Sequence, residues 1–285
     1  MTKPLADKTF IVTGANTGIG KITARELARA GAHVILACRS EPKTAAVIEE
    51  IKREIGNASS VIEYLHLDLA DLASVRACAE AILARNVPIH GLINNAGLAG
   101  GRGLTRDGFE LTFGTNHLGH YLFTRLLLDR IKQAGTARIV NVASASHYRA
   151  KGLEWDALKQ PTRTVTGMHE YAMSKLSNVL FTKELARRLE GTGVTTYAVH
   201  PGVVATDVWR RVPAPLRWVM KKFMITPEQG AESSLRCATD PELASQTGRY
   251  YDTGGKEAEP NRLANDVELA RTLWSRSAEW TGLAA

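Results

Sequence analysis

Short runs rich in β-branched and apolar residues alternate with longer amphipathic stretches over the first 200 residues. The short runs predict strands at Thr9–Val12, His33–Ala37, Val61–His66, Ile89–Asn94, Ala137–Ala143 and Val194–His200. The longer stretches predict helices at Gly18–Ala30, Lys43–Ile55, Leu72–Arg85, Asp107–Lys132 and Tyr171–Glu190. Such alternation predicts an α/β fold with a doubly wound parallel sheet and helices on both of its faces. No linker or repeat interrupts the pattern, so we expect a single domain over residues 1–285.

Composition and the N-terminal residues narrow the class of protein. With 44% hydrophobic and 23% charged residues, the chain has the balance of an ordinary globular protein. It contains no apolar run as long as a transmembrane helix, and its N-terminus has no apolar signal-peptide region. Cys38, Cys78 and Cys237 are odd in number and widely spaced, which indicates reduced thiols rather than disulfides or a zinc site. We therefore expect a cytoplasmic protein.

The net charge of +7 raises the question of nucleic-acid binding. Lysine and arginine are spread over many predicted helices, however, and the sequence has no known DNA- or RNA-binding motif. A basic surface also suits an anionic small ligand. The sequence therefore predicts no nucleic-acid partner.

A glycine-rich turn follows the first predicted strand and opens the first predicted helix. It reads Thr-Gly-Ala-Asn-Thr-Gly-Ile-Gly over residues 13–20, with glycines at 14, 18 and 20. Backbone amides at a helix N-terminus, with no side chains in front of them, are suited to bind a pyrophosphate. Such a turn can also be a structural corner, but its place between strand and helix favours a Rossmann-type dinucleotide site.

The end of the second predicted strand bears on which dinucleotide binds. NAD-binding proteins usually place an Asp or Glu here, which holds the ribose 2′-hydroxyl. This chain has Cys38 followed by Arg39, and no acid before Glu41. Because an arginine can pair bidentately with a 2′-phosphate, the sequence favours NADP(H) over NAD(H). The alternative is that Arg39 is only a solvated residue in front of a helix.

Polar residues also follow the third and fourth predicted strands. Asp68 could accept a hydrogen bond from an adenine amino group, and Asn94–Gly97 could line the adenine ribose. Asp and Asn also end strands for reasons of turn geometry alone. These residues therefore support a dinucleotide site only in combination with the glycine turn.

Tyr171 and Lys175 are four residues apart in a predicted helix, so they share one face. A free tyrosine has a pKa of about 10 and exchanges protons poorly at neutral pH. A neighbouring ammonium favours the phenolate, so we expect Lys175 to lower the pKa of Tyr171 and to make it a general acid or base. The spacing alone is common in helices, and it gains meaning from the dinucleotide site that precedes it.

Two regions break the alternation, and both follow strand ends at which open α/β sheets bind ligands. Ser146–Glu170 is predicted to be an irregular excursion. Val203–Pro227 interleaves aromatic residues with cations, which predicts a substrate lid with an apolar inner face. Such a lid favours a lipophilic carbonyl substrate and weak contact with an anionic membrane surface. The alternative is an ordinary covering helix whose tryptophans belong to the core.

Together these residues resemble the short-chain dehydrogenase/reductase family. The matching motifs stand in the family's order along nearly the whole chain: Thr13–Gly20, Asp68, Asn94–Gly97, Asn116, Ser144, Tyr171 with Lys175, and Pro201-Gly202. The resemblance implies that Tyr171 exchanges a proton with the substrate oxygen and that Ser144, with Ser146 as its alternative, hydrogen-bonds that oxygen. It implies that Lys175 also bonds the nicotinamide ribose, and that Asn116 holds a water linking Lys175 to solvent. The predicted catalytic residues are thus Asn116, Ser144, Tyr171 and Lys175.

The resemblance also assigns the cofactor contacts, with Pro201, Gly202 and Thr206 positioning the nicotinamide carboxamide. The predicted cofactor-binding residues are Gly14, Asn16, Thr17, Gly18, Ile19, Gly20, Arg39, Asp68, Leu69, Asn95, Ala96, Gly97, Tyr171, Lys175, Pro201, Gly202, Val204 and Thr206. We expect a cofactor-binding part over roughly 8–145 and a catalytic and substrate-lid part over roughly 146–285.

Longer segments are similar to the retinol dehydrogenase branch of this family. They include residues 37–39, 116–120 and 193–204, together with the 27-residue separation of Ser144 from Tyr171. The chain departs from the animal enzymes because it lacks their hydrophobic N-terminal anchor and has Ala-Met-Ser between Tyr171 and Lys175. A soluble bacterial-type relative with a different physiological substrate fits both departures.

The leading hypothesis is an NADP(H)-dependent oxidoreductase that interconverts an alcohol and an aldehyde or ketone, with a retinol- or retinal-like substrate. A broad-specificity carbonyl reductase and a steroid-type dehydrogenase are the alternatives among enzymes. A dinucleotide-sensing binding protein is a third alternative, although such sensors typically lose the tyrosine or the lysine. The family often pairs through the helices that contain Asn116 and Tyr171, so a homo-oligomer is a further expectation.

Three histidines invite other interpretations. His117 and His120 are three residues apart but have no evident third ligand, so we predict no metal site. Ser144 with His147 suggests a hydrolase, but the chain has no Gly-x-Ser-x-Gly nucleophile motif. His117 and His120 are therefore interpreted as structural, and the hydrolase interpretation is set aside.

Overall fold

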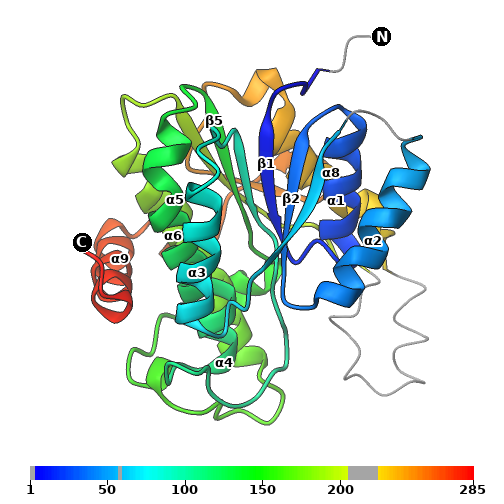
Figure 1. The fold of residues 1–285 in the computed structure, drawn as a ribbon. Coiled ribbons are helices and arrows are strands. Elements are labelled where there is room, and N and C mark those ends of the chain that lie inside the picture. The colour runs from blue at the N-terminus through cyan, green and yellow to red at the C-terminus, as the bar shows by residue number, and fades with distance from the viewer. Residues whose placement is uncertain (1–3, 57–59, 205–223) are drawn as a thin grey trace.

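The computed structural model describes residues 4–56, 60–204 and 224–285, and one sheet of eight strands runs through them (Figure 1). The strand order is β3-β2-β1-β4-β5-β6-β7-β8, and neighbours are parallel except β7 and β8. The strands are β1 (Thr9–Thr13), β2 (His33–Cys38), β3 (Ile62–His66), β4 (Gly91–Asn94), β5 (Ala137–Val142), β6 (Val194–Val199), β7 (Arg249–Asp252) and β8 (Lys256–Glu257). The predicted α/β fold with a doubly wound parallel sheet is confirmed.

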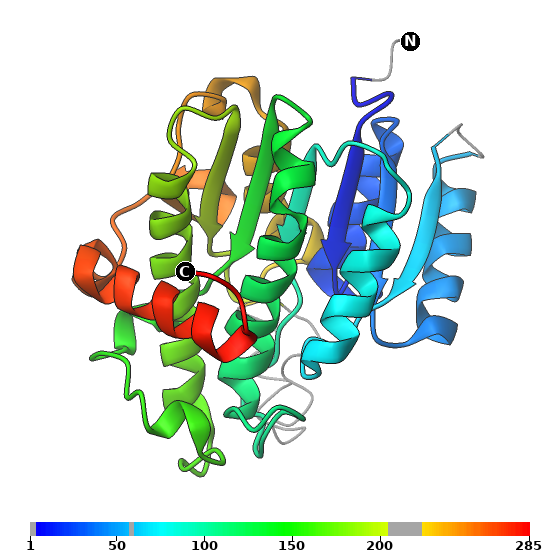
Figure 2. The same cartoon turned by 60° about the vertical axis from the view of Figure 1, so that its left-hand side comes forward.

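Helices cover both faces of the sheet, as Figure 1 and Figure 2 show. One face carries α1 (Gly18–Arg29), α2 (Glu41–Glu54) and α8 (Pro227–Thr239). The other carries α3 (Leu72–Leu83), α5 (Gly119–Lys132) and α6 (Met168–Arg188), with α9 (Val267–Thr281) packed outside α6. Because each face buries its own apolar core, all five residues of β1 are buried.

The helix predicted at Asp107–Lys132 begins later, at Leu111, and is irregular. α4 (Leu111–Phe113) continues into a π-helical turn over Gly114–Leu118, which α5 follows without a break. In this turn the Gly119 amide donates to Gly114 O, five residues back. Turns of this kind occur frequently at functional sites. Asn116, one of the predicted catalytic residues, lies in the middle of it.

The excursion predicted at Ser146–Glu170 is confirmed as mostly irregular. It contains short 3₁₀ turns over Ala145–Arg149 and Ala157–Lys159. α6 then begins at Met168, three residues before the predicted start, so Tyr171 lies in its first turn. The N-terminal end of α6 therefore lies at the carboxyl edge of the strands.

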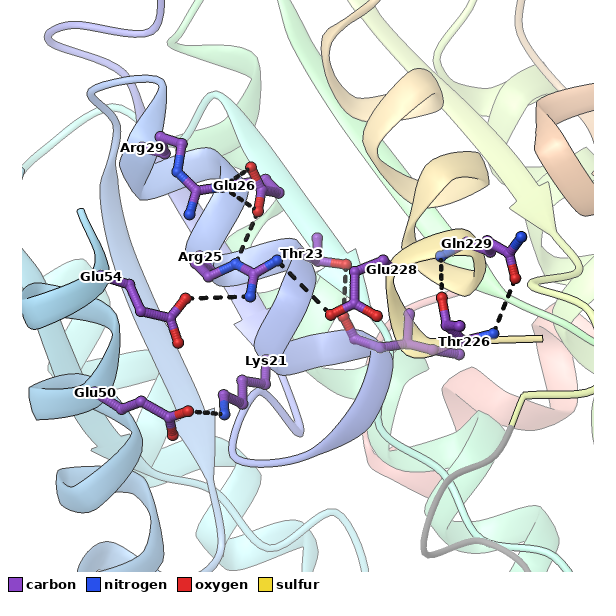
Figure 3. A network of polar contacts seen from close by, with 11 residues as sticks. Lys21, Thr23, Arg25, Glu26, Arg29, Glu50, Glu54, Thr226, Glu228 and Gln229 are labelled. Carbon is purple, nitrogen blue, oxygen red and sulfur yellow. Dashed lines mark hydrogen bonds and ion pairs between the residues drawn. The ribbon is translucent and has the colours of Figure 1, made fainter. Parts of the chain in front are cut away.

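Ion pairs link α1 to the two helices beside it (Figure 3). They are Lys21–Glu50, Arg25–Glu54 and Arg25–Glu228, and two further pairs, Arg25–Glu26 and Arg29–Glu26, lie within α1 itself. Arg25 is central, since its guanidinium lies 3.2 Å from Glu54 of α2 and 3.9 Å from Glu228 of α8. These contacts fix the outer side of the helix that opens the predicted cofactor site.

Candidate active site

A cavity of about 1170 Å³ lies at the carboxyl edge of the sheet. It lies where the order of the strands reverses, between β1 and β4, which is where open α/β sheets bind ligands. Its lining includes every predicted cofactor-binding residue within the described part of the chain. Thr206, the one remaining member of that set, lies outside the described residues. Among the predicted catalytic residues, Ser144, Tyr171 and Lys175 line the cavity and Asn116 lies behind its wall.

The glycine turn brings bare backbone to this cavity. Gly14 has a positive φ of 63°, and a Cβ there would lie 2.9 Å from Cα of Ala96. At Gly20, in the first turn of α1, a Cβ would lie 2.6 Å from Gly14 O. Thr17 and the first-turn residues of α1, Gly18, Ile19 and Gly20, line the cavity. A turn closed to side chains, at the positive end of a helix, fits the pyrophosphate of a dinucleotide.

The end of β2 presents cations to the cavity. Cys38 is buried, whereas Arg39 and Lys43 are exposed and line the cavity with Ser40. Lys43 was missed in the sequence, although its position in the first turn of α2, four residues after Arg39, could have indicated it. Two cations and a hydroxyl at this place can bind an anionic substituent of the cofactor.

Asp68 provides the one acidic side chain among the described residues that line the cavity. Its Oδ1 accepts a hydrogen bond from the Ala70 amide at 3.0 Å, which leaves Oδ2 available for a ligand. Leu69 lines the cavity beside it. The carboxylate thus shapes its own turn, as the alternative interpretation held, and also faces the site.

The segment after β4 is divided between core and cavity. Asn94 points into the sheet interior, where its Nδ2 donates to Asn141 Oδ1 at 2.8 Å, and it does not line the cavity. Asn95 Nδ2 donates to Thr13 O at 2.8 Å, so this side chain holds the glycine turn. Residues 95–97 line the cavity, and their expected contact with the adenine ribose stays a prediction.

Ser144, Tyr171 and Lys175 meet at the other end of the cavity. Ser144 follows β5 and accepts a hydrogen bond from the Ser146 amide at 3.2 Å. Its hydroxyl lies near enough to that of Tyr171 to lower the pKa of the tyrosine, which supports Ser144 over Ser146. Lys175 Nζ lies 5.7 Å from the centroid of the Tyr171 ring and donates to Val142 O at 2.8 Å. One substrate oxygen can therefore approach two hydroxyl groups, with an amine nearby.

The protonation of this group differs from the prediction. We expected Lys175 to lower the pKa of Tyr171, but burial raises the pKa of Tyr171, and the neighbouring Ser144 hydroxyl only partly offsets this. Burial also lowers the pKa of Lys175 to about 7. The lysine therefore lacks a permanent charge with which to favour the phenolate, because the same apolar surroundings penalise both ions.

Asn116 is fully engaged by protein partners. Its Oδ1 accepts from the Leu98 amide at 2.9 Å, and its Nδ2 donates to Leu98 O and to Ser174 Oγ, each at 3.0 Å. A Cβ on Gly97 would lie 3.2 Å from Asn116 Oδ1 and 3.6 Å from Lys175 Nζ. Gly97 thus leaves a small polar space between the amide and the lysine. The water expected to link Lys175 to solvent stays a prediction.

Pro201, Gly202 and Val204 line the cavity after β6, as predicted. The predicted lid begins here, but most of it lies in residues 205–223, outside the described residues. Its proposed contacts with substrate and with a membrane surface therefore stay predictions. In the ranges that the structure describes, no helix is both long enough and apolar enough to span a bilayer.

The histidines have partners within the protein. His147 Nδ1 lies 2.7 Å from the backbone oxygen of Ser144 rather than from its hydroxyl, so it does not activate that serine as a nucleophile. His117 Nε2 lies 3.1 Å from Ser277 Oγ of α9. Among residues 4–56, 60–204 and 224–285, no cluster of His, Cys, Asp and Glu side chains is suited to a metal ion.

Comparisons with known proteins agree with this site. A profile of the family described as short chain dehydrogenase matches residues 8–155. Human retinol dehydrogenase 13 is 44% identical over an alignment covering 98% of this chain and 86% of that protein. Human retinol dehydrogenase 11 is 43% identical, covering 99% of this chain and 88% of its own length.

Solved structures extend the match to the fold. An uncharacterised protein from Mycobacterium paratuberculosis shares 34% identity and superposes with a TM-score of 0.77, covering 98% of this chain and 94% of its own. A protein from Beutenbergia cavernae, assigned as an NAD(P)-dependent gluconate 5-dehydrogenase and crystallised with NADP at low occupancy, shares 27% identity. It superposes with a TM-score of 0.70, over 90% of this chain and 98% of its own. With its site and its relatives in agreement, the chain belongs to the short-chain dehydrogenase/reductase family, an oxidoreductase family that uses nicotinamide dinucleotides, and to the retinol dehydrogenase-like branch within it.

Proposed function

We propose that this protein is an NADP(H)-dependent oxidoreductase that interconverts a lipophilic, retinol-like alcohol and its aldehyde. The observation that carries the proposal is one cavity with Tyr171 and Ser144 at one end and Arg39 and Lys43 at the other. The relatives named retinol dehydrogenase 11, 12 and 13, at 41–44% identity, support the substrate class.

NADP(H) is favoured by the charges at the end of β2. Arg39 and Lys43 are exposed cations that face the cavity, and the acid that usually holds a free ribose 2′-hydroxyl is missing there. A 2′-phosphate suits this pair, since Arg supplies a bidentate fork and Lys a point charge. The NADP in the related Beutenbergia structure supports the same choice.

Apolar side chains contribute to the substrate end of the cavity, beside polar ones that include Arg149 and His200. Leu98, Leu111 and Met168 line it beside Tyr171, together with Val203 and Val204. Apolar walls with a few polar groups are typical of sites for lipophilic small molecules, with the polar groups fixing orientation. A long hydrocarbon chain with one oxygen at its end, as in retinol or retinaldehyde, matches this arrangement.

The bound dinucleotide supplies or accepts the hydride. Tyr171 donates a proton to the substrate oxygen during reduction, and Ser144 hydrogen-bonds the same oxygen. Burial raises the pKa of Tyr171, so its hydroxyl carries the proton at neutral pH but donates it only when neighbouring groups stabilise the phenolate. Lys175, whose pKa lies at about 7, can gain or lose a proton under the same conditions, and the space beside Gly97 lies between its amine and Asn116.

The test is NADPH consumption by the purified protein with retinaldehyde and with a panel of smaller aldehydes, ketones and steroids. Tyr171→Phe removes the proposed acid. Tyr148→Phe is its matched control, because the Tyr148 hydroxyl donates to Glu259 O and does not line the cavity. Retinaldehyde turnover that is lost in Tyr171→Phe and kept in Tyr148→Phe supports the proposal. Turnover of other carbonyls alone contradicts the retinoid assignment, and NADPH binding without any turnover favours a sensor.

The predicted cytoplasmic location and homo-oligomeric state belong to the same proposal. Size-exclusion chromatography with light scattering tests the second of them. A monomer at micromolar concentrations would contradict it.

A further inference from the structure

His120 joins two parts of the site that are distant in sequence. It lies in the first turn of α5 and is 2% exposed. Its Nδ1 lies 3.0 Å from Asn116 O in the π-helical turn, and its Nε2 lies 2.9 Å from Thr13 Oγ1 at the end of β1. It does not line the cavity, so any effect on the reaction must pass through these partners.

The chemistry of the partners fixes the direction of both bonds. A carbonyl oxygen only accepts, so His120 Nδ1 carries a proton and donates it to Asn116 O. Burial lowers the pKa of His120 to about 4, so the ring is neutral at neutral pH and its Nε2 is an acceptor. The Thr13 hydroxyl is therefore the donor in the second bond.

Every donor and acceptor position of the Thr13 hydroxyl then has a hydrogen-bond partner. Oγ1 accepts from the amides of Asn95 and Ala96, both at 2.9 Å. Its proton has a second acceptor in Ile93 O, but at 3.4 Å this is the longer contact. An aliphatic side chain at position 120 would leave Thr13 with the longer bond and Asn116 O without the imidazole.

These contacts close a ring. Thr13 holds residues 95 and 96 at one end of the loop after β4, and the Asn116 side chain holds Leu98 at its other end. His120 connects Thr13 to the backbone of Asn116 and thereby completes the circuit. The loop inside the ring, residues 95–98, lines the cavity throughout.

We infer that His120 is a positioning residue, which holds the loop 95–98 and the π-helical turn at a fixed separation and so keeps the cofactor-binding backbone aligned with Asn116. This inference rests on the proposed function only in that the loop binds a dinucleotide. It is independent of the choice between NADPH and NADH, because Arg39 and Lys43 lie after β2 and outside the ring.

Two substitutions separate the two bonds of the imidazole. In His120→Asn the side-chain amide can still reach Asn116 O but is too short for Thr13. In His120→Gln the longer side chain can place an oxygen near the former Nε2 and accept from Thr13. Thr13→Val removes the hydroxyl with little change in shape, and Thr13→Ser retains it. His117→Gln is the matched control, since His117 is equally buried in the same helical segment but bonds Ser277 instead.

The experiment is a titration of each variant with NADPH and with NADH, followed by fluorescence. We expect His120→Asn to raise both dissociation constants about three- to tenfold, as for loss of one buried hydrogen bond. Thr13→Val should raise them by at least as much, because it also removes the acceptor of the Asn95 and Ala96 amides. The double variant, His120→Asn with Thr13→Val, should bind both cofactors no more weakly than Thr13→Val alone, because both changes break the same ring of hydrogen bonds. His120→Gln, Thr13→Ser and His117→Gln should stay within about twofold of wild type.

Three outcomes overturn the inference. They are unchanged binding in His120→Asn, additive effects in the double variant, and a loss in His117→Gln as large as that in His120→Asn. Should His120→Asn fail to fold, the comparison of Thr13→Val with Thr13→Ser and His120→Gln decides in the same way. Equal affinity of the wild type for both cofactors, or silence with retinaldehyde, contradicts the proposed function without bearing on the ring.

Discussion

The two ends of the cavity are built on different principles. At the catalytic end, Lys175 and Asn116 are almost completely buried, and their polar atoms are held by the backbone of Val142 and Leu98. At the adenosine end, Arg39 and Lys43 are exposed and stand on the surface of α2 and the turn before it. Buried groups are held in one geometry because leaving them unpaired is costly, whereas exposed charges can be exchanged at little cost in stability. Turnover should therefore depend on the first end and cofactor choice on the second.

The largest effect is expected at the catalytic end. Tyr171→Phe should lower kcat by about 10²- to 10⁴-fold, the usual contribution of a general acid. The dissociation constant of NADPH should change less than about threefold, because the ring of the side chain is retained. Single-turnover kinetics combined with fluorescence titration measures both quantities. A loss of cofactor affinity as large as the loss of kcat would break the separation between the two ends.

The next effect belongs to the adenosine end. Arg39→Ala combined with Lys43→Ala should weaken NADPH binding about 10- to 100-fold, since charge-assisted hydrogen bonds to a phosphate are lost. NADH binding should be almost unchanged, and kcat at saturating cofactor should remain that of wild type. Arg53→Ala serves as the control, because Arg53 is an exposed cation of α2 that does not line the cavity. Equal losses for both cofactors would contradict the 2′-phosphate assignment.

A smaller effect is expected on the free energy of unfolding, whose dependence on pH should differ between substitutions at the two ends. The pKa of Lys175 is lowered from 10.5 to about 7 in the folded protein. Between these values the unfolded chain binds the proton and the folded protein releases it. The free energy of unfolding of wild type should therefore rise with pH relative to Lys175→Met, by at most about 1.4 kcal/mol per pH unit. Below pH 7 the difference should level off, because the lysine is protonated in both states.

Urea unfolding of the two proteins at pH 6, 7, 8 and 9, without cofactor, measures this difference. Lys43→Met is the control at the exposed end. Its free energy of unfolding should change with pH in the same way as that of wild type. A difference that stays constant between pH 7 and pH 9 would mean that Lys175 keeps its charge in the folded protein over this range.

The smallest effect is expected on the outside of α1. Arg25→Ala removes its contacts with Glu26, Glu54 and Glu228, but these groups are partly exposed and one of the distances is 3.9 Å (Figure 3). The free energy of unfolding should fall by about 1 kcal/mol or less. Cofactor affinity should not change, because the glycine turn is held from within by Thr13 and Asn95. A marked loss of NADPH binding would show that the outer contacts of α1 also position the site.

The sequence predicted the cofactor end better than the catalytic end, for a physical reason. The glycine turn, Arg39 and Asp68 are local features that follow strands of clear pattern, and the structure places them on one cavity. Lys43 was missed, although its spacing of four residues from Arg39 at the start of a helix was a local signal for it. The direction of the pKa shift of Tyr171 was wrong because it depends on burial, which arises only when α6 packs against β5.

The C-terminal third shows the other limit of sequence reasoning. β7 has two tyrosines between charged residues, and β8 consists of Lys256 and Glu257 alone, so neither shows an apolar run. The π-helical turn could not be predicted from the sequence either, because its apolar residues are spaced as in an ordinary helix. The hydrogen-bond partners of His120 could likewise not be predicted from the sequence, since they lie four and 107 residues away from it along the chain.

β8 has a further consequence for how the protein behaves in a crowded solution. A parallel sheet can in principle accept another strand at either edge, and an unprotected edge invites pairing with a second chain. Here the last strand turns back against β7, has only two residues, both charged and exposed, and carries an ion pair between Arg249 and Glu257. It offers a visiting strand too few backbone groups to pair with. The least conspicuous element of the sheet thus keeps its otherwise open side from becoming a template for aggregation.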